Sequence, residues 1–356
     1  MRNTFISKLS FVFLNILVVT NIYAADPDYI SGPQVDDFIT YMADKYNLDQ
    51  YDLSNFLYNA KYQADVIKLI QKPAEKLPWY RYESLFLQDN RVKAGVKFWQ
   101  ENAEVLDKAS KQYGVPAELI VSLIGVETFY GNNKGKFPVL DTLATLAFYY
   151  PPRSKFFISE LEHFLVFSHE ENSDPRTYLG SYAGAMGYPQ FIASSIRNYA
   201  IDYSNSGNRD LENNTANAIG SVANYINKFG WKTNEPITVE VSLKKLNKKN
   251  YNLIAKHIDK LQPKLPVKKL TNLGINLVNP EVKSKNKFKN NYNNLNTSLL
   301  SFEEKTGKQY RLGFNNFYVI TKYNNSQNYA LAVYLLSEKI KQEYQKTKVV
   351  MQTKKV

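Results

Sequence analysis

Apolar side chains recur at helical spacing through most of the first two thirds of the chain. Glycine is common directly after the C-terminus of a helix, and Gly114, Gly131 and Gly230 each follow an apolar stripe. Pro116 suits the first position of the helix that ends at Gly131. The spacing predicts helices within residues 30–72, 94–113, 116–130, 155–170 and 215–229.

After Trp231 the pattern changes from helical spacing to alternation. Residues 236–241 alternate apolar and polar side chains like a strand, and Leu265–Leu277 and Tyr310–Thr321 also read as strands. From Asn328 the helical spacing returns. We therefore predict an α+β protein with a helical body, a small β-rich insertion at 232–320 and a closing C-terminal helix.

The first 24 residues have the make-up of a secretory signal peptide. Arg2 and Lys8 form a short positive region, a mostly apolar run from Leu9 to Thr20 follows, and cleavage is expected after Ala24. The apolar run is about 12 residues long, short of the ~20 that span a bilayer, which favours cleavage over an uncleaved anchor helix. No cysteine follows that could carry a lipid anchor. We expect export, and no transmembrane segment in the mature chain.

Composition excludes several kinds of chemistry. Apolar residues make up 44% of the chain and aromatic residues 14%, enough for a large core. The absence of cysteine excludes disulfides, thiolate nucleophiles and zinc–thiolate sites. Three histidines are too few for a histidine-rich metal centre.

Charge is divided unevenly along the chain. Residues 25–231 carry 19 basic and 25 acidic side chains, whereas residues 232–356 carry 24 basic and 8 acidic ones. This asymmetry predicts a polyanion or an anionic surface as partner. Nucleic acid fits poorly, because an exported protein does not meet it and the Lys/Asn-rich stretch 283–296 lacks regular aromatic residues. That stretch reads as a solvated loop.

Glu127 is the strongest candidate for acid–base chemistry. Leu123 and Ile124 lie one turn before it, and Phe129 and Tyr130 follow closely. Burial among such groups disfavours a charged carboxylate and raises its pKa, which keeps a glutamic acid protonated near neutral pH. From the pattern alone, the alternative is a glutamate that points to solvent near a helix end.

A glycine-rich segment at 180–191 offers polar groups to a ligand. Its three glycines let backbones approach closely, and Ser181, Tyr188 and Gln190 present hydroxyl and amide groups. The alternative is a tight, packed turn without a ligand. Aromatic side chains beside polar ones, as at 148–153, suit the apolar faces and hydroxyl edges of sugars, although core packing must account for most aromatic residues.

Residues 202–213 have the spacing of a calcium loop. Asn213 stands at position 12, where a bidentate glutamate is expected, and two carboxylates predict weak Ca²⁺ binding at most. A surface turn without an ion fits at least as well. The candidate ligands at positions 1, 3, 5, 7 and 9 are Asp202, Ser204, Ser206, Asn208 and Asp210, with Gly207 at position 6.

Taken together, seven segments resemble the B-type lytic murein transglycosylases, in order and over roughly residues 30–340. They are Ile124-Gly-Val-Glu-Thr-Phe-Tyr-Gly131, Leu140-Asp-Thr-Leu-Ala-Thr-Leu146, Tyr149 to Arg153, Gly184-Ala-Met-Gly-Tyr-Pro-Gln-Phe191, Ala218-Ile-Gly-Ser-Val-Ala-Asn-Tyr225, Gly230-Trp231 and Phe317-Tyr-Val-Ile-Thr-Lys-Tyr-Asn-Asn-Ser326.

The resemblance implies a lysozyme-like, mainly helical core with a flanking helical domain and a small antiparallel β domain. We accordingly expect a signal peptide at 1–24 and a helical domain at 25–80 that the C-terminal helix 328–356 completes. The catalytic core would span 81–231, the basic β-rich domain 232–320, and residues 321–330 would return to the cleft.

The resemblance also implies cleavage of the β-1,4 bond between N-acetylmuramic acid and N-acetylglucosamine in peptidoglycan. Glu127 would act first as acid and then as base, yielding a 1,6-anhydro product without water or a required cofactor. Ser181 and Gln190 would bind near the reacting sugar. The cleft would be lined by Tyr149, Arg153, Tyr188, Asn324 and Tyr329.

Two departures from the family pattern stand out. The family often has two adjacent arginines where this chain has Pro152-Arg153, and its calcium loop usually carries more carboxylates. The expected partners are peptidoglycan glycan strands and cell-wall synthesis or remodelling complexes in the periplasm. A hydrolytic lysozyme and a non-catalytic peptidoglycan-binding protein are the alternatives.

Overall fold

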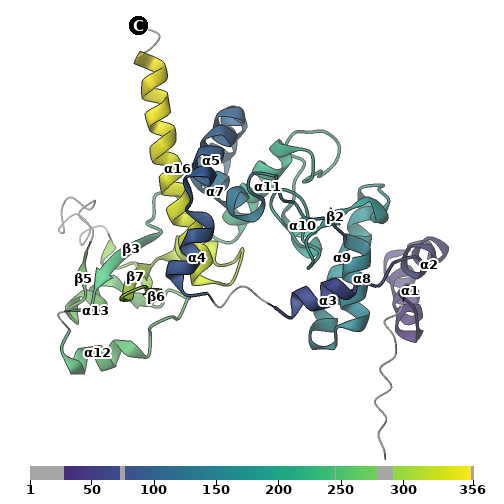
Figure 1. The fold of residues 1–356 in the computed structure, drawn as a ribbon, viewed down its shortest axis with the longest axis horizontal. Helices are drawn as coiled ribbons and strands as arrows, with labels where there is room; N and C mark the ends of the chain where they lie inside the picture. Colours follow the sequence, from purple (N-terminus) through teal and green to yellow (C-terminus); the bar gives the residue numbers. More distant parts are fainter. Residues whose placement is uncertain (1–27, 73–76, 245, 279–291, 354–356) are drawn as a thin grey trace, which may run out of the picture.

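A computed structural model describes residues 28–72, 77–244, 246–278 and 292–353. The expected signal peptide at 1–24 lies outside these residues, as does most of the Lys/Asn-rich stretch. The elements form a helical flank at one end, a central helical body, and a β-rich domain at the other end (Figure 1). Within the described residues, no helix combines the length and apolar character needed to cross a membrane.

The described part of the flank consists of five helices. α1 packs against α2, and α3 packs against α8, which runs alongside α9. Asn47 ends α1 in a left-handed conformation, and the Asp49 side chain caps α2 by accepting the Asp52 N–H. The flank helices are α1 (Pro33–Tyr46), α2 (Gln50–Tyr58), α3 (Ala64–Ile70), α8 (Val139–Tyr149) and α9 (Ser154–Glu170).

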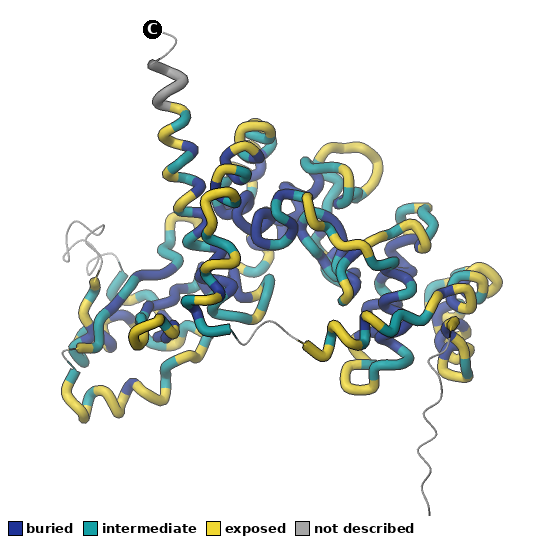
Figure 2. The backbone as a smooth tube through the Cα atoms, in the orientation of Figure 1, coloured by how far each residue is buried: buried dark blue, intermediate teal, exposed yellow. Residues whose placement is uncertain are grey.

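The central body is built around α7 (Ala117–Thr128), whose side chains are almost all buried. A helix that is apolar on every side belongs inside a core, and Figure 2 shows the buried positions gathered in this part of the molecule. The predicted helix 94–113 is interrupted at Asn102. The other body helices are α4 (Trp79–Phe86), α5 (Asp89–Glu101), α6 (Ala103–Tyr113), α10 (Ala193–Tyr199), α11 (Thr215–Lys228) and α16 (Gln327–Thr353).

The C-terminal helix packs differently from our expectation. We predicted that it completes a domain at 25–80, but α16 lies along α7, α5 and α4. The reason is the apolar stripe of α16, whose Val333 carbonyl accepts a 2.6 Å hydrogen bond from the buried Ser122 hydroxyl of α7. Further along, Tyr344 stacks on Trp99 of α5 at 4.2 Å.

The β-rich domain holds one five-stranded antiparallel sheet in the order β4-β6-β7-β3-β5. It has a hydrophobic core of its own, in which Val239, Leu299 and Leu312 are buried. Its strands are β3 (Thr238–Ser242), β4 (Leu265–Pro266), β5 (Asn276–Leu277), β6 (Asn296–Glu304) and β7 (Gly307–Gly313). Its helices are α12 (Lys248–Ala255) and α13 (Val267–Asn272), and α15 (Asn315–Ile320) leads back to the body.

Two predicted strands are wrong in detail, and one strand was missed. Leu265–Leu277 is β4, α13 and β5, because Pro266 starts a helix that buries Val267 and Leu270 one turn apart. Tyr310–Thr321 is the end of β7 followed by α15. β6 was not predicted, because residues 297–302 are all buried, and apolar and polar side chains therefore do not alternate along the strand.

The remaining short elements connect the flank and the body. β1 (Phe137–Pro138) pairs with β2 (Leu179–Gly180) in a small antiparallel ladder. The 3-10 turns η2 (Pro151–Arg153) and η3 (Pro175–Thr177) begin and follow α9. The ladder brings the glycine-rich segment at 180–191 to the body side of α8.

Candidate active site

Glu127 lies in the last turn of the buried helix α7. The residue keeps partial exposure, while its Oε1 accepts a 2.6 Å hydrogen bond from the hydroxyl of Tyr329 at the start of α16. Burial raises the pKa of Glu127 to about 7, and the Tyr329 hydrogen bond acts in the opposite direction because it favours the carboxylate. The carboxyl group is therefore poised to hold or release a proton near neutral pH.

Three tyrosines line the carboxyl group. Tyr323 stacks on Tyr329 with ring centroids 6.4 Å apart, and the ring centroid of Tyr225 of α11 lies 5.0 Å from that of Tyr323. Burial and the charge of Glu127 raise the pKa of all three phenols, so they stay neutral hydrogen-bond donors. Tyr225 and Tyr323 were absent from our predicted site, although both lie inside the segments that carry the resemblance.

The backbone directly after Glu127 is strained. Phe129, Tyr130 and Gly131 have φ angles of 51°, 59° and 90°, and the left-handed region is costly for residues other than glycine. The Thr128 hydroxyl accepts the Gly131 N–H at 2.9 Å and donates to the Tyr188 carbonyl at 3.1 Å. These bonds hold the turn in place.

Arg91 of α5 holds the same turn from the other side. Its guanidinium lies 4.7 Å from the centre of the Phe129 ring and donates to the carbonyl of Gly125. The Tyr130 hydroxyl donates back to the Arg91 carbonyl at 2.9 Å. Strain that surrounding contacts maintain is typical of functional sites, and here it fixes the position of Glu127.

The glycine-rich segment folds back on itself beside the three tyrosines. The Ser181 hydroxyl accepts the amides of Ala183 and Ala185 at 3.3 and 3.1 Å, which leaves its own proton available to a ligand. The Gln190 amide nitrogen donates to Lys134 O at 2.9 Å and to a second backbone carbonyl, so its side-chain oxygen can face a ligand. The Tyr323 hydroxyl donates to the Pro189 carbonyl at 2.6 Å, joining this segment to the Glu127 site.

Tyr188 and Asn324 also lie beside this site. The Tyr188 ring packs so closely on Gly131 that an added Cβ would lie 2.2 Å from it, and the Lys134 ammonium sits 5.1 Å from the ring centre. Asn324 is part of the turn between Tyr323 and Tyr329. The predicted residues Tyr329, Tyr188, Gln190, Ser181 and Asn324 are thus grouped around the end of α7.

The structure places Tyr149 and Arg153 apart from this group. The Tyr149 hydroxyl donates to the Ser31 carbonyl at 3.2 Å, and its ring meets Tyr62 edge-on. Arg153 is exposed, with its guanidinium 4.3 Å from the Phe156 ring centre. Both lie where the flank helices α8 and α9 meet.

The geometry of residues 202–213 does not fit a tight calcium site. Asp202 already accepts the backbone N–H groups of Ser206 and Gly207 at 2.9 and 2.7 Å. Asp210 accepts those of Glu212 and Asn213 at 2.8 and 2.9 Å. Within the described residues there is no cluster of three or more His, Asp or Glu side chains that could hold a metal. The segment is an Asx-rich turn closed by its own hydrogen bonds.

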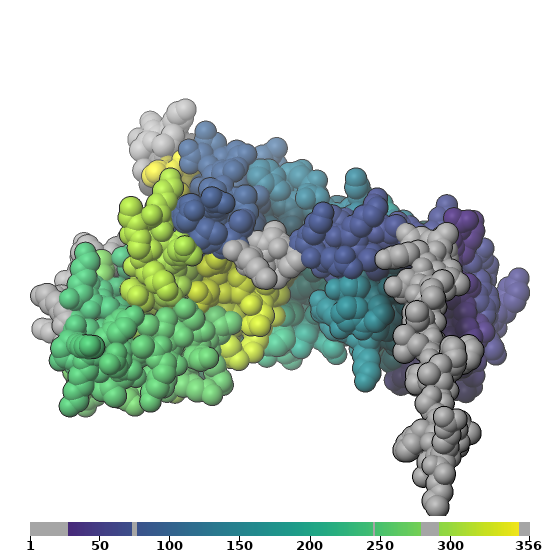
Figure 3. Space-filling model, turned by 60° about the horizontal axis from the view of Figure 1, so that its bottom comes forward, coloured from purple at the N-terminus to yellow at the C-terminus, as the bar shows by residue number. Residues whose placement is uncertain are grey.

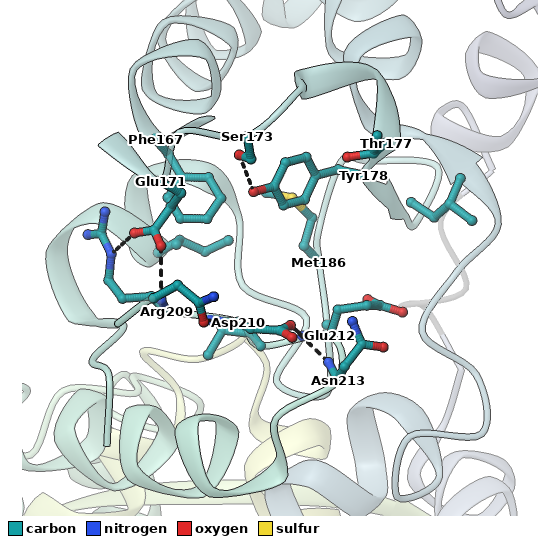
Figure 4. A pocket seen from close by; sticks show the side chains of 15 residues that line it. Phe167, Glu171, Ser173, Thr177, Tyr178, Met186, Arg209, Asp210, Glu212 and Asn213 are labelled. Atoms are coloured by element: carbon teal, nitrogen blue, oxygen red, sulfur yellow. Dashed lines mark hydrogen bonds and ion pairs between the residues drawn. The ribbon is translucent and has the colours of Figure 1, made fainter. Parts of the chain in front are cut away.

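Next to this turn lies a cavity of about 410 Å³ that is separate from Glu127 (Figure 4). On one side Glu171 and Arg209 form an ion pair at 2.5 Å, and on another the Ser173 and Tyr178 hydroxyls are 2.6 Å apart. These polar groups hydrogen-bond to one another. The pair between Glu171, directly after α9, and Arg209 joins the 202–213 turn to α9.

Comparisons with known proteins agree on one family. The family model "Transglycosylase SLT domain" matches residues 31–338. The "Membrane-bound lytic murein transglycosylase B" of Escherichia coli K12 is 36% identical over 335 residues, covering 90% of this chain and 86% of that protein.

Solved structures give the same result. The soluble lytic transglycosylase SltB1 from Pseudomonas aeruginosa matches with a TM-score of 0.78 and 37% identity, covering 87% of this chain and 99% of that one. The E. coli Slt35 complex with calcium matches with a TM-score of 0.76 and 36% identity, covering 88% of this chain and 94% of that one. P. aeruginosa SltB3, solved with NAG-anhNAM-pentapeptide, matches with a TM-score of 0.73 and 27% identity, covering 86% of this chain and 78% of that one.

These matches span the flank, the body and the β-rich domain, and they include the segment that carries Glu127. They confirm the predicted α+β, lysozyme-like architecture, and this family's chemistry needs no cofactor. The chain belongs to the transglycosylase SLT domain family, as one of its B-type lytic murein transglycosylases.

Proposed function

We propose that this protein cleaves the β-1,4 bond between N-acetylmuramic acid and N-acetylglucosamine in peptidoglycan, with Glu127 as its single acid and base. The observation that carries the proposal is the state of Glu127: a desolvated carboxyl with a pKa raised to about 7. In the described part of the chain, the polar contact of the Glu127 carboxyl is the hydrogen bond from the Tyr329 hydroxyl, and no carboxylate shares it. A two-carboxylate glycosidase would need a carboxylate partner nearby.

The reaction uses one carboxyl group twice, first as acid and then as base. Protonated Glu127 gives its proton to the glycosidic oxygen, and the bond between that oxygen and C1 of the muramic residue breaks. The Glu127 carboxylate then takes the proton of the C6 hydroxyl, and the C6 oxygen bonds to C1. The products are a free N-acetylglucosamine 4-hydroxyl and a 1,6-anhydromuramic end, and Glu127 is protonated again. No water is consumed.

The tyrosine group supports both steps. Between them Glu127 is a carboxylate, and the short bond from Tyr329 stabilises that form and fixes its direction. Ser181, Tyr188, Gln190 and Asn324 offer hydrogen bonds to the sugars on either side of the broken bond. Tyr149 and Arg153 would meet sugars or peptides farther along the strand.

The substrate class agrees with what one relative binds. SltB3 was solved with NAG-anhNAM-pentapeptide and with NAG-NAM-pentapeptide, fragments that carry both sugars and a peptide. Peptidoglycan lies outside the inner membrane, which fits the signal peptide expected at residues 1–24. We infer a periplasmic enzyme without a lipid anchor, which works on glycan strands within wall-remodelling complexes.

Digestion in H₂¹⁸O tests the proposal against its nearest rival. A transglycosylase makes its new end from the substrate's own C6 hydroxyl, so muropeptides released from purified sacculi should carry no ¹⁸O and should resist borohydride reduction. One ¹⁸O per cleaved bond, with reducible muramic ends, would make the protein a hydrolytic lysozyme. Binding to sacculi without any released product would make it a wall-binding protein.

A further inference from the structure

The described part of the β-rich domain carries lysines that no acidic side chain neutralises. Between residues 241 and 278 the sequence has nine lysines and a single acidic residue, Asp259. The Asp259 carboxylate is already engaged, because it accepts the backbone N–H and the hydroxyl of Ser301 at 2.7 and 2.8 Å. Eight of the nine lysines lie in the described residues, and all eight are exposed.

None of these eight lysines forms an ion pair within the described residues; the pairs of this domain are Lys232 with Glu235 and Arg311 with Glu240. The helical parts of the chain differ. There Lys111 pairs with Asp107 at 2.6 Å, and Lys341 pairs with Glu118 at 2.7 Å. The positive charge of the β-rich domain therefore points outward, free to meet an anionic partner.

Two neighbouring cavities lie among these lysines. One, of about 310 Å³, is walled by α12 and α13, with Ile254 and Leu270 among its apolar lining and Lys256 and Lys269 at its edge. The other, of about 400 Å³, includes Lys260 and Lys264. The two cavities share His257 and Leu265. We call this surface, from α12 to α13, the lysine face.

The lysine face combines charge with recessed apolar surface. An occupant must bring several carboxylates on a flexible chain, together with small apolar groups that fit a cavity of this size. The peptide stems of peptidoglycan have this chemistry, since they carry carboxylates and alanine methyl groups. Figures 1 and 3 place the β-rich domain at one end of the molecule, away from the flank.

We propose that the lysine face binds the carboxylate-bearing peptide stems of peptidoglycan, at a site separate from Glu127. The proposal rests on the proposed function, because the same polymer occupies both sites. Two linked contacts on one polymer bind more tightly than either alone, since the second forms at a high effective concentration. The face thus holds the enzyme on the wall between one cleavage and the next.

An anionic membrane surface is the competing partner, because it also attracts lysines. The cavities favour the peptide. A flat lipid surface gains from protruding apolar side chains. Of the apolar lining of the cavity between α12 and α13, Leu253 protrudes at 47% exposure, whereas Ile254 and Leu270 are recessed at 1% exposure each and can contact only a ligand that enters the cavity.

Sedimentation with purified sacculi tests the proposal. In a Glu127→Gln background, which prevents cleavage, Lys256, Lys264 and Lys269 are changed together to Gln. We expect about tenfold weaker binding, and a weaker dependence on salt, since exposed ion pairs are individually modest but add. A Lys→Arg version of the same triple should bind like the parent. The matched control changes the exposed Lys72, Lys93 and Lys228 to Gln and should bind unchanged.

Two further substrates separate the sources of negative charge. Glycan strands freed of their stems by an amidase are soluble, and the parent and the lysine-face triple should bind them equally. Equal binding of both proteins to intact sacculi, or a difference that persists on the stem-free strands, would overturn the proposal. So would binding to phosphatidylglycerol vesicles that depends on the triple while sacculus binding does not. Release of anhydro-muropeptides by the chain with intact Glu127 is measured separately, so failure of the proposed function is recognised on its own.

Discussion

The Tyr329 hydroxyl donates a 2.6 Å hydrogen bond to Oε1 of Glu127 across 202 residues of sequence. The bond joins the first turn of α16 to the last turn of α7. Because it favours the carboxylate while burial favours the acid, it sets where Glu127 titrates. A group that must donate and then accept one proton needs a pKa near the working pH.

Changing Tyr329 to Phe should shift the pH dependence of the reaction. Without the hydroxyl the pKa of Glu127 rises further, since only the stabilisation of its charged form is lost. The first step needs protonated Glu127, so the wild-type rate should fall as the pH rises above about 7. In the variant this fall should move to higher pH, and the rate at neutral pH should drop about tenfold because the carboxylate is no longer oriented.

The control for this prediction is Tyr344→Phe on the same helix. Tyr344 stacks on Trp99 far from Glu127 and should leave the pH profile unchanged. Profiles measured by turbidity of a sacculus suspension from pH 5 to 9 would decide the matter. A Tyr329→Phe profile that coincides with the wild type would show that the bond does not tune the acid.

The sequence predicted more of this site's chemistry than of its surroundings. Glu127 was found because a lone carboxyl within an apolar helix stands out. Its hydrogen-bond partner Tyr329 and the proposed sugar-binding residues Ser181 and Gln190 came from the resemblance, since no local pattern connects positions so far apart.

What the sequence could not show was set by tertiary packing. Tyr225 and Tyr323 are ordinary aromatic residues until α11 and the α15–α16 turn bring them to Glu127. The partners of α16 were mistaken for the same reason, because its apolar stripe does not say which helix it will meet. In the β-rich domain, the short strands β4 and β5 carry too few residues for alternation to separate them from α13.

Replacing Gly131 with Ala should damage the turn after Glu127. An added Cβ would lie 2.2 Å from the Tyr188 ring, in addition to the cost of a φ of +90°. Gly230→Ala is the matched control, because its φ is also +90° but nothing lies within 4 Å of the added carbon. We expect about 1 kcal/mol of destabilisation for Gly230→Ala and about 1–3 kcal/mol more for Gly131→Ala.

Urea unfolding of the two glycine variants measures this difference directly. Activity should fall in Gly131→Ala alone, since Tyr188 and Glu127 lie on either side of that turn. Equal stability losses in both variants would mean that the Tyr188 ring moves aside at no cost and does not fix the turn.

Arg91→Met should loosen the same turn. The change removes a half-buried cation that lies over Phe129 and donates to Gly125 O, at a cost of about 1–3 kcal/mol. Arg176→Met serves as control, because Arg176 also lies over a phenylalanine ring, at 5.3 Å, but is exposed and should cost under about 1 kcal/mol. Thermal unfolding of both variants is the measurement. An unfolding temperature of Arg91→Met equal to that of the wild type would contradict the role given to this arginine.

Chelation should leave the enzyme active. Asp202 accepts backbone amides on both carboxylate oxygens and Asp210 on Oδ1, and the other candidate ligands are neutral, so Ca²⁺ should bind weakly at most. Dialysis against EDTA should change neither the turnover of sacculi nor the unfolding temperature. A loss of either that 1 mM Ca²⁺ restores, in the range of weak extracellular sites, would show that the turn rearranges around an ion.

The central claim is that Glu127 alone supplies and removes the proton. Glu127→Gln keeps the size of the side chain and its place beside Tyr329 but can neither donate nor accept that proton. Mass spectrometry of the products from purified sacculi should show 1,6-anhydro-muropeptides from the wild type and at least about a thousandfold less from Glu127→Gln, with sacculus binding and unfolding temperature retained. Anhydro-muropeptides released at a comparable rate by a folded Glu127→Gln variant would contradict the account.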